Sequence, residues 1–375
     1  MKMFLRLSCI AIPVMLFSFA IYAVGGEFAE IFKDDAGRYI YSYPSGLSFA
    51  EISEENSHSG EICLRLELDH NNYSGAGYAL HNPIDASRIR EKGSLQFWVK
   101  GGSGGEKFEI VLVNEQKDGR KAESFFDVAM IAGTGKEWQK ISIPLSSFPA
   151  NAVYWDGAQG KELPIKFDWS NINELKIRTR PDAKSGKSIV LYFDDVVLNE
   201  GSESSIKELS IYKEGDPLYT YSYGGNSRIE IVADNYKSKP SVKMSLDTKD
   251  YSGAAFAFGP LDLSSARNKG VLEFMLKSEK GGEQVELNAV KADDPKIEVG
   301  IELSSVKPIS SDWQKYEIPL KDFPSKGIYW NSQAGREISG ELVEWNRIGE
   351  LKFKIKKGEN KNCVLYVSDV KIRLN

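Results

Sequence analysis

The stretch from Trp138 to Trp155, WQKISIPLSSFPANAVYW, occurs a second time from Trp313 to Trp330 as WQKYEIPLKDFPSKGIYW. Ten of the eighteen positions carry the same residue at the same spacing. Both tryptophans are among them, in a chain that has only 7 tryptophans. Self-similarity at such a long period indicates that one structural unit has been duplicated.

The repeat extends beyond this stretch in both directions. Residues 39–43 read YIYSY and residues 219–223 read YTYSY, while the motif Tyr-Ser-Gly-Ala begins at both Tyr73 and Tyr251. Each copy is about 170 residues long, which is the size of a whole domain rather than of a solenoid unit.

The repeat therefore predicts two domains, residues 27–200 and residues 206–375. The segment between them, GSESS at residues 201–205, is a small polar linker that is too short to give the domains much independence.

Residues 1–23 have the pattern of a secretory signal peptide. Lys2 and Arg6 provide a positive start, and an apolar run follows from residue 7 to residue 20. The alternative is an uncleaved membrane anchor, which Pro13 and the shortness of the run disfavour. We therefore expect an exported protein, periplasmic or extracellular, without a transmembrane segment in its mature chain.

Charge and cysteine content narrow the class of protein. The formal net charge is −5 and the isoelectric point is near 5.6, so nothing suggests a nucleic-acid partner. Cys63 and Cys363 occupy non-equivalent positions in the two copies, whereas a disulfide framework would have been duplicated with the domain. We expect two buried free thiols.

Apolar residues alternate with other residues at period two, as in residues 95–99 (LQFWV) and 272–276 (LEFML). This pattern is typical of half-buried strands, and clusters of Gly, Ser, Asn and Asp separate the strands. Many short strands with turns between them indicate antiparallel sandwiches. The predicted fold is all-β, with two tandem jelly-roll β-sandwich domains after the signal peptide.

The motif GSLQFWVKG at residues 93–101 is followed by the repeated stretch, by Leu-Lys-Ile at residues 175–177 and by LYFDDVVL at residues 191–198. In this order the motifs resemble carbohydrate-binding modules with the galactose-binding-like jelly roll, similar to families 11, 30 and the merged 4/9 group. The resemblance covers both repeats. It implies the jelly-roll fold and a glycan ligand, although its motifs specify strands and turns rather than a site.

The sequence offers little for catalysis. The only histidines are His58, His70 and His81, and all three lie in the first repeat. No nucleophile elbow, metal-binding histidine pair or phosphate loop is present. The many acidic residues leave a glycosidase-like carboxylate pair open. We predict that the protein is not an enzyme.

A candidate sugar platform lies on the strand at residues 94–100. If Phe97 and its alternating neighbours face the core, the opposite face carries Gln96, Trp98 and Lys100. A sugar ring stacks its apolar face on a flat aromatic ring while polar side chains hold its hydroxyls. The alternative is that a loop or the other domain covers Trp98, since the second copy has Met275 at this position.

Two further groups of aromatic residues are candidates for ligand contact. The tyrosines at positions 39, 41 and 43 lie on one face of a regular strand, either lining a cleft or packing on the core with their hydroxyls at the rim. The pairs Tyr154-Trp155 and Tyr329-Trp330 lie at strand–loop junctions. In each pair one ring is expected to pack inward and the other to be free for a ligand; a shared structural role is the alternative.

A basic row, Lys176, Arg178 and Arg180, returns in the second copy as Lys352, Lys354 and Lys356. Facing outward, such a row would favour carboxylated or sulfated glycans. The alternative is that these cations keep an exposed sheet soluble.

The family resemblance implies a structural Ca²⁺ that ties the last strand of each module to the segment before its first strand. Asp195 and Asp369 stand at the matching positions. Calcium takes six to eight oxygen ligands. The others would have to come from Asp34 or Asp35 in the first copy and from Glu214 or Asp216 in the second.

Taken together, the sequence predicts an exported, non-catalytic glycan-binding protein whose partner is a polysaccharide, neutral or acidic. The alternative is a structural or assembly protein of the cell envelope with a protein partner. A glycan binder needs exposed aromatic residues on a sheet face, whereas an assembly protein needs a broad apolar patch or open strand edges.

Overall fold

The computed structural model describes residues 26–34, 39–44, 46–69, 71, 73–179, 188–201, 206–213, 216–217, 220–237, 239–247, 251–293, 295–355 and 363–374. The signal peptide predicted for residues 1–23 lies outside them and stays a prediction. Within the described residues, no helix has the length and apolar character needed to cross a membrane.

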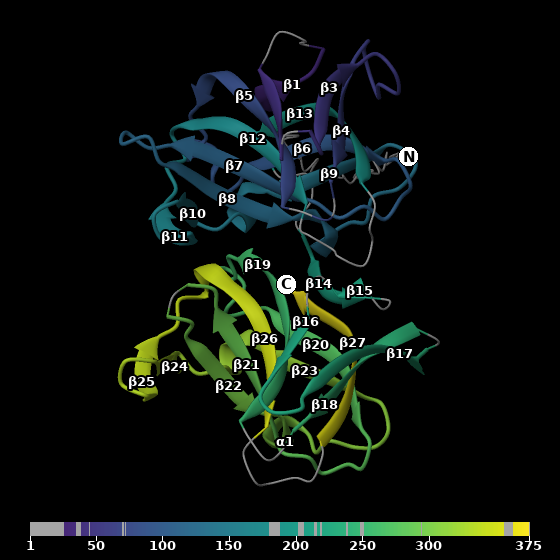
Figure 1. The fold of residues 1–375 in the computed structure, drawn as a ribbon, viewed down its shortest axis with the longest axis vertical. Coiled ribbons are helices and arrows are strands. Elements are labelled where there is room, and N and C mark those ends of the chain that lie inside the picture. Colours follow the sequence, from purple (N-terminus) through teal and green to yellow (C-terminus); the bar gives the residue numbers. More distant parts are fainter. Residues whose placement is uncertain are drawn as a thin grey trace, which may run out of the picture.

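The chain folds into two β-sandwiches that follow one another along the long axis of the molecule (Figure 1). Helical structure in the described residues is limited to single turns. The predicted all-β fold with two tandem sandwiches is therefore confirmed.

In the first sandwich, η1 (Ser87–Ile89), η2 (Val128–Met130) and η3 (Leu145–Ser147) are 3-10 turns. Its strands are β1 (Glu27–Phe32), β2 (Ile40–Tyr43), β3 (Phe49–Ser53), β4 (Cys63–Leu68), β5 (Ser74–Ile84), β6 (Ser94–Gly101), β7 (Glu109–Glu115), β8 (Lys121–Asp127), β9 (Gln139–Pro144), β10 (Asn151–Asp156), β11 (Lys161–Lys166), β12 (Ile172–Thr179) and β13 (Ile189–Asn199).

The first sandwich has two antiparallel sheets. One has the order β3-β4-β13-β6-β9, with β1 beside β13. We call it the terminal sheet, because it holds the first and last strands of the domain. The other has the order β11-β10-β8-β7-β12-β5-β2. We call it the hairpin sheet, because the β10–β11 hairpin forms one of its edges.

In the second sandwich, α1 (Leu303–Val306), η4 (Leu320–Asp322) and η5 (Trp345–Arg347) are single turns. Its strands are β14 (Glu208–Lys213), β15 (Asp216–Pro217), β16 (Thr220–Tyr223), β17 (Arg228–Tyr236), β18 (Lys239–Leu246), β19 (Ser252–Leu261), β20 (Val271–Ser278), β21 (Val285–Lys291), β22 (Glu298–Glu302), β23 (Gln314–Pro319), β24 (Lys326–Asn331), β25 (Arg336–Leu342), β26 (Ile348–Ile355) and β27 (Cys363–Arg373).

The second sandwich repeats the two-sheet plan. Its terminal sheet has the order β15-β14-β27-β18-β17, and β20 pairs with both β27 and β23. Its hairpin sheet has the order β16-β19-β26-β21-β22-β24-β25, so the β24–β25 hairpin corresponds to the β10–β11 hairpin. The duplication seen in the sequence therefore extends to the strand order of the hairpin sheets.

Alternation along each strand builds the core between the two sheets. On β6, Leu95, Phe97 and Val99 are at most 1% exposed. The ring of Phe97 lies 5.6 Å from that of Phe193 on the neighbouring β13. Burying each such side chain contributes roughly 1.5–3 kcal/mol. The buried free thiols expected at positions 63 and 363 are also present.

The repeated stretch crosses from one sheet to the other. It begins as β9 in the terminal sheet, passes through η3 and continues as β10 in the hairpin sheet. Phe148, at the crossing, is fully buried, and its carbonyl oxygen accepts a hydrogen bond of 2.7 Å from Arg90 Nη2. The Arg90 guanidinium also lies 4.5 Å from the ring of Trp169. The second sandwich repeats the clamp with Arg267, Phe323 and Trp345, so packing explains much of the recurrence.

Candidate ligand-binding faces

The outer face of the hairpin sheet, which points away from the core, carries a floor of charged side chains. In the first sandwich Lys176 and Arg178 on β12 lie beside Glu109 on β7 and Glu123 on β8. These positions alternate with core residues such as Ile177, which is 1% exposed. The basic row therefore does face away from the core, as the alternation predicted.

The row is nevertheless not an exposed basic surface. Arg178 is 2% exposed; its Nε lies 2.6 Å from Glu109 Oε2 and its Nη1 lies 3.0 Å from Glu123 Oε2. Lys176 Nζ lies 2.5 Å from Glu123 Oε1. Burial would lower the pKa of Arg178, but the attraction of Glu109 and Glu123 outweighs it and raises that pKa.

The second sandwich has the same floor, in which carboxylates neutralise the cations. Lys352 Nζ and Lys354 Nζ lie 2.5 Å and 3.2 Å from the two carboxylate oxygens of Glu298. Burial would raise the pKa of Glu298, but Lys352 and Lys354 lower it. This corrects both predictions for the basic row. Its cations are paired with carboxylates, so it is not a free basic surface for acidic glycans, and they are buried, so it is not a solvated face. Arg180 and Lys356 lie outside the described residues.

A ladder of tyrosines covers the β2 side of this face. The rings of Tyr39 and Tyr41 stack with centroids 5.9 Å apart, and those of Tyr41 and Tyr43 lie 6.3 Å apart. Ile40, between them, packs against the core instead. The interpretation that these tyrosines pack on the core is therefore wrong. They lie on the outer face, and Tyr39 is 69% exposed.

Glycines on β5 allow the tyrosine rings to lie flat on the sheet. A Cβ atom added at Gly75 would sit 2.5 Å from Tyr43 Oη, and one added at Gly77 would sit 2.4 Å from the ring of Tyr41. Tyr41 Oη donates a hydrogen bond to Glu174 on β12, and burial raises the pKa of Tyr41. In the second sandwich Tyr221 donates to Glu350 at 2.7 Å in the same way.

Another duplicated tyrosine stands over the charged floor. Arg178 lies 5.3 Å from the ring of Tyr73 on one side and 4.3 Å from the ring of Phe125 on the other. In the second sandwich Lys354 lies 5.3 Å from the ring of Tyr251. Tyr73 and Tyr251 are each 49% exposed. Sequence reasoning treated them only as markers of the repeat, although their place before a glycine-containing strand was a usable signal.

The opposite edge of each face carries an exposed tryptophan. Trp155 on β10 is 66% exposed and Trp330 on β24 is 63% exposed. Trp155 lies on the same side of its strand as Val153, which packs with Phe125 on the outer face. Tyr154 points the other way and is half-buried under Arg120, 4.8 Å from its ring. Tyr329 is half-buried as well.

The predicted platform around Trp98 lies on the terminal sheet, whereas these aromatic residues belong to the hairpin sheet. His58, in the loop between β3 and β4, stacks on Trp98 with ring centroids 3.7 Å apart. Lys100 Nζ lies 3.0 Å from Asn56 Oδ1 of the same loop, and Gln96 is only 4% exposed. The loop thus covers the platform, so the alternative that a loop covers Trp98 is confirmed and the open platform is corrected.

The aspartates proposed for calcium take unusual backbone positions. Asp195 and Asp369 have φ angles of 47° and 49°, in the left-handed region, where β13 and β27 change register. The Asp195 carboxylate lies 2.9 Å from Ser59 Oγ and 3.1 Å from His58 Nδ1. Asp34 Oδ1 accepts from the backbone N of Glu61 at 2.8 Å.

The carboxylates of Asp195 and Asp34 therefore already accept hydrogen bonds from the protein itself. Among the described residues, no three His, Cys, Asp or Glu side chains converge as metal ligands. Asp35 and Glu214 lie outside the described residues, as does the side chain of Asp216. The side chains that contact Asp195, a hydroxyl and an imidazole, do not supply the six to eight oxygen ligands that calcium takes. The calcium site stays a prediction.

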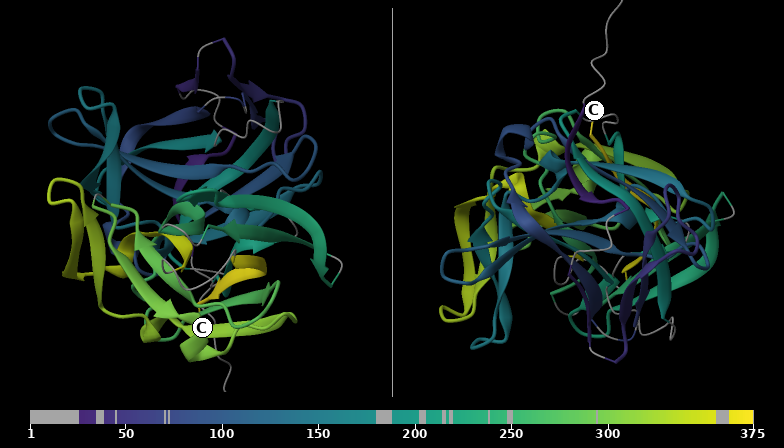
Figure 2. Two further views of the ribbon diagram at one scale, coloured as in Figure 1. Left: turned by 60° about the horizontal axis from the view of Figure 1, so that its bottom comes forward. Right: turned by 90° about the horizontal axis from the view of Figure 1, so that it is seen from above.

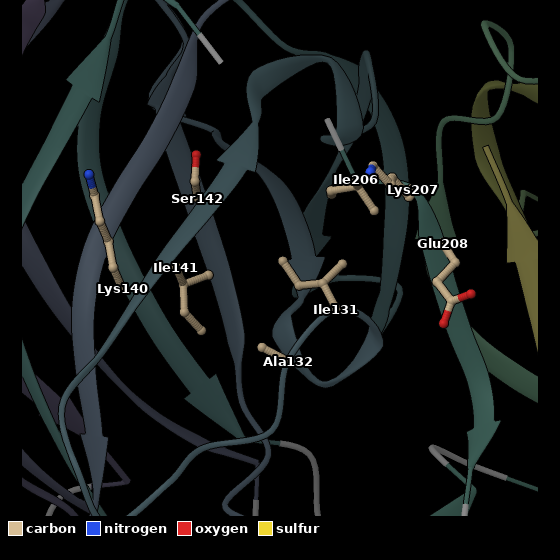
Figure 3. A pocket seen from close by; sticks show the side chains of 8 residues that line it. All are labelled: Ile131, Ala132, Lys140, Ile141, Ser142, Ile206, Lys207 and Glu208. Carbon is tan, nitrogen blue, oxygen red and sulfur yellow. The ribbon is translucent and has the colours of Figure 1, made fainter. Parts of the chain in front are cut away.

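A pocket of about 310 Å³ lies where the two sandwiches meet (Figure 3). Its walls combine residues of β9, the segment after η2 and the segment leading into β14. Lining residues are Ile131, Ala132, Lys140, Ile141, Ser142, Ile206, Lys207 and Glu208. None of the exposed aromatic residues described above lines it, so it belongs to the domain junction rather than to either face.

Comparisons with known proteins identify one family and several similar structures. The sequence profile of the family "Carbohydrate binding domain 30" matches residues 29–200 and again residues 208–373. A search of curated proteins found no match.

Three of the solved structures found have low identity to the chain. The family 30 module of a cellulosomal cellulase of Clostridium thermocellum is 22% identical over 47% of this chain and 98% of that chain, with a TM-score of 0.37. The family 11 module from Clostridium thermocellum, in complex with a β-1,3-1,4-mixed-linked tetrasaccharide, is 15% identical over 49% and 99%, with a TM-score of 0.34. The N-terminal tandem of CBM22 domains from Paenibacillus barcinonensis Xyn10C is 12% identical over 94% and 98%, with a TM-score of 0.28.

Proposed function

The chain belongs to the carbohydrate binding domain 30 family in both of its halves, and on that premise we propose that it is an exported, non-catalytic glycan-binding protein. In this proposal each hairpin sheet binds a glycan on its outer face. The sugar rings contact the tyrosines near β2 or β16 and the tryptophan of the opposite hairpin.

One observation carries the proposal. On the outer face of each hairpin sheet, exposed aromatic residues flank a floor of ion-paired Lys, Arg and Glu side chains. Tyr73 and Trp155 in the first sandwich correspond to Tyr251 and Trp330 in the second, with exposures of 49–66%. Exposed aromatic rings bury much apolar area at little entropic cost when a ligand stacks on them. Residues needed only for packing would not remain exposed twice.

The charges of the floor favour a neutral glycan over an acidic one. Arg178 and Lys176 are already paired with Glu109 and Glu123, so they have little to offer an incoming carboxylate or sulfate. An acidic ligand would have to compete with buried ion pairs.

The same pairing supports a non-catalytic role. A glycosidase needs one carboxylic acid that is protonated near neutral pH, which requires a raised pKa. On the second face Lys352 and Lys354 instead lower the pKa of Glu298. On the first face, Glu109 and Glu123 are both held by Arg178. Burial raises the pKa of Glu162 on β11, which is the carboxylic acid that a catalytic role would have to use. Export, periplasmic or extracellular, rests on residues 1–23 alone.

A glycan array tests the function directly. The wild type and the double variant Trp155→Ala/Trp330→Ala are compared, and Trp98→Phe serves as the control on the terminal sheet. Binding should be lost in the double variant and kept in the control, with melting temperatures unchanged in both. Binding that survives the double variant but disappears in Trp98→Phe would refute the proposed faces. An array without any glycan signal would refute the function itself.

A further inference from the structure

We propose that the two binding faces act together on one polysaccharide strand that is longer than either face. This inference rests on the proposed function, and it concerns how the two sandwiches are held relative to each other. Three observations carry it. The two faces lie on the same side of the molecule, the sandwiches contact each other at their junction, and one of these contacts is made to the strand that carries Trp155.

Both hairpin sheets lie on the same side of the molecule. In Figure 1 the β10–β11 hairpin and the β24–β25 hairpin project from the same edge of the two sandwiches. Viewed from above, along the long axis, the two hairpins project to the same side of the molecule (Figure 2), while Figure 1 shows them separated along that axis. The exposed tryptophans Trp155 and Trp330 are carried by these hairpins. A strand that runs along the long axis can therefore pass both of them.

The junction between the sandwiches is built from apolar contacts. One continuous cluster of buried apolar residues has members from both domains. Strand β19 lies against β8 of the first sandwich. Ile206, at the end of the linker, packs against this cluster and lines the junction pocket together with Ile131 and Ile141. The relative orientation of the two faces is thus fixed by packing rather than left to the linker.

A buried arginine links the two domains at this junction. Arg347 of η5 is 4% exposed, and its Nε lies 2.5 Å from Asp293 Oδ1 within the second sandwich. Its Nη1 donates to the carbonyl oxygen of Asn151 in the first. The contact is not duplicated, because the first repeat has Asn171 at the position that corresponds to Arg347. Only this order of the two domains forms it.

The accepting residue ties the junction to the first binding face. Asn151 opens β10, and Trp155 lies four residues further along the same six-residue strand. The second domain therefore holds the strand that presents the tryptophan of the first. Once one face has bound a polymer, the second binding event becomes intramolecular, and a fixed orientation raises its effective concentration. Tandem sites of this kind can gain on the order of 10²–10⁴ in affinity.

Titration calorimetry on the full chain tests the inference. The probes are soluble β-glucan, xylan and mannan, each with the tetrasaccharide of the same linkage. For the probe that binds, the tetrasaccharide should occupy two sites, and Trp155→Ala or Trp330→Ala should each remove one site. On the polymer, each single variant should instead lose tenfold or more in affinity.

The junction is tested separately. Arg347→Ala should weaken polymer binding by severalfold and leave tetrasaccharide binding at both sites unchanged. Asn151→Ser is the matched control, because the acceptor is a main-chain oxygen, and it should change neither. The inference is overturned if the polymer binds no more tightly than its tetrasaccharide and the single tryptophan variants change only the stoichiometry. Should Arg347→Ala not fold, the exposed tryptophan variants still decide the question. Absence of binding to every probe would instead contradict the proposed function.

Discussion

His58 stacks on Trp98 with ring centroids 3.7 Å apart and 17° between the ring planes, and this contact closes the β3–β4 loop over the terminal sheet of the first sandwich. Asp195 also contacts the His58 ring, and its Oδ2 lies 3.1 Å from Nδ1. The second sandwich has Met275 in place of Trp98, so the covered platform is a property of the first domain alone.

Removing this histidine should expose the indole without unfolding the domain. We expect His58→Ala to shift the fluorescence of Trp98 to longer wavelength and to lower the free energy of unfolding by about 1 kcal/mol. His81→Ala, at an exposed position, is the matched control and should do neither. The difference spectrum against Trp98→Phe isolates the signal. An unchanged spectrum in His58→Ala would show that the stacking is absent in solution.

The buried Arg178 should be far more important for stability than a surface arginine. Arg178→Met removes the guanidinium that neutralises the buried Glu109 and leaves Glu123 to Lys176, which should cost roughly 3–5 kcal/mol. Arg65→Met breaks pairs with Glu51 and Glu67 at the surface and should cost less than about 1 kcal/mol. Urea denaturation measures both. Similar losses would argue that the floor is solvated after all.

Glycine at position 75 should be required for the tyrosine ladder. A Cβ atom there would lie 2.5 Å from Tyr43 Oη and 2.7 Å from the carbonyl oxygen of Ile177. Gly75→Ala should therefore displace the ring and destabilise the domain by about 1–3 kcal/mol. Gly157→Ala meets nothing within 4 Å and should be nearly neutral. Equal melting temperatures for the two variants would contradict the close packing of Tyr43 on β5.

The second face should make stability depend on pH in the acidic range. The pKa of Glu298 is lowered in the folded state relative to its ordinary value of 4.5, so its contribution is fully present above that value. As the pH falls from about 4.5 through the lowered folded pKa, this contribution is lost. Melting curves between pH 7 and pH 3 should show the loss, and Glu298→Gln should lose less over the same range. A wild type and variant with parallel profiles would rule out this linkage.

The two thiols should be unreactive in the native protein. Burial raises the pKa of Cys63 to about 11 and that of Cys363 to about 12, so very little thiolate exists at neutral pH. A disulfide-exchange reagent should therefore label neither residue until denaturant is added, and then both. Rapid labelling of one thiol in the native state would indicate local opening of β4 or β27, the strands that carry them.

The sequence predicted the fold well because strand formation depends on short-range patterns, which can be read from neighbouring residues. Alternation placed Phe97 in the core, and the paired aromatic stretches revealed two domains. The same alternation placed Arg178 on the outer face but could not show its burial. That burial arises from Phe125 and Tyr73, which approach from two other strands or loops. The sequence left open whether Trp98 is exposed or covered by a loop, and alternation could not decide this, since His58 reaches it from a loop forty residues earlier in the chain.

Strand β10 connects two contacts that were described separately: Asn151 accepts a hydrogen bond from the second sandwich at one end, and Trp155 stands exposed near the other. If a polymer bound at Trp155 is pulled, the tension passes along a folded strand and into the second sandwich through Arg347. The strand is paired with β11 over its full length, so its hydrogen bonds would be loaded together in shear rather than opened one at a time. In this geometry, the polar linker carries only part of the force.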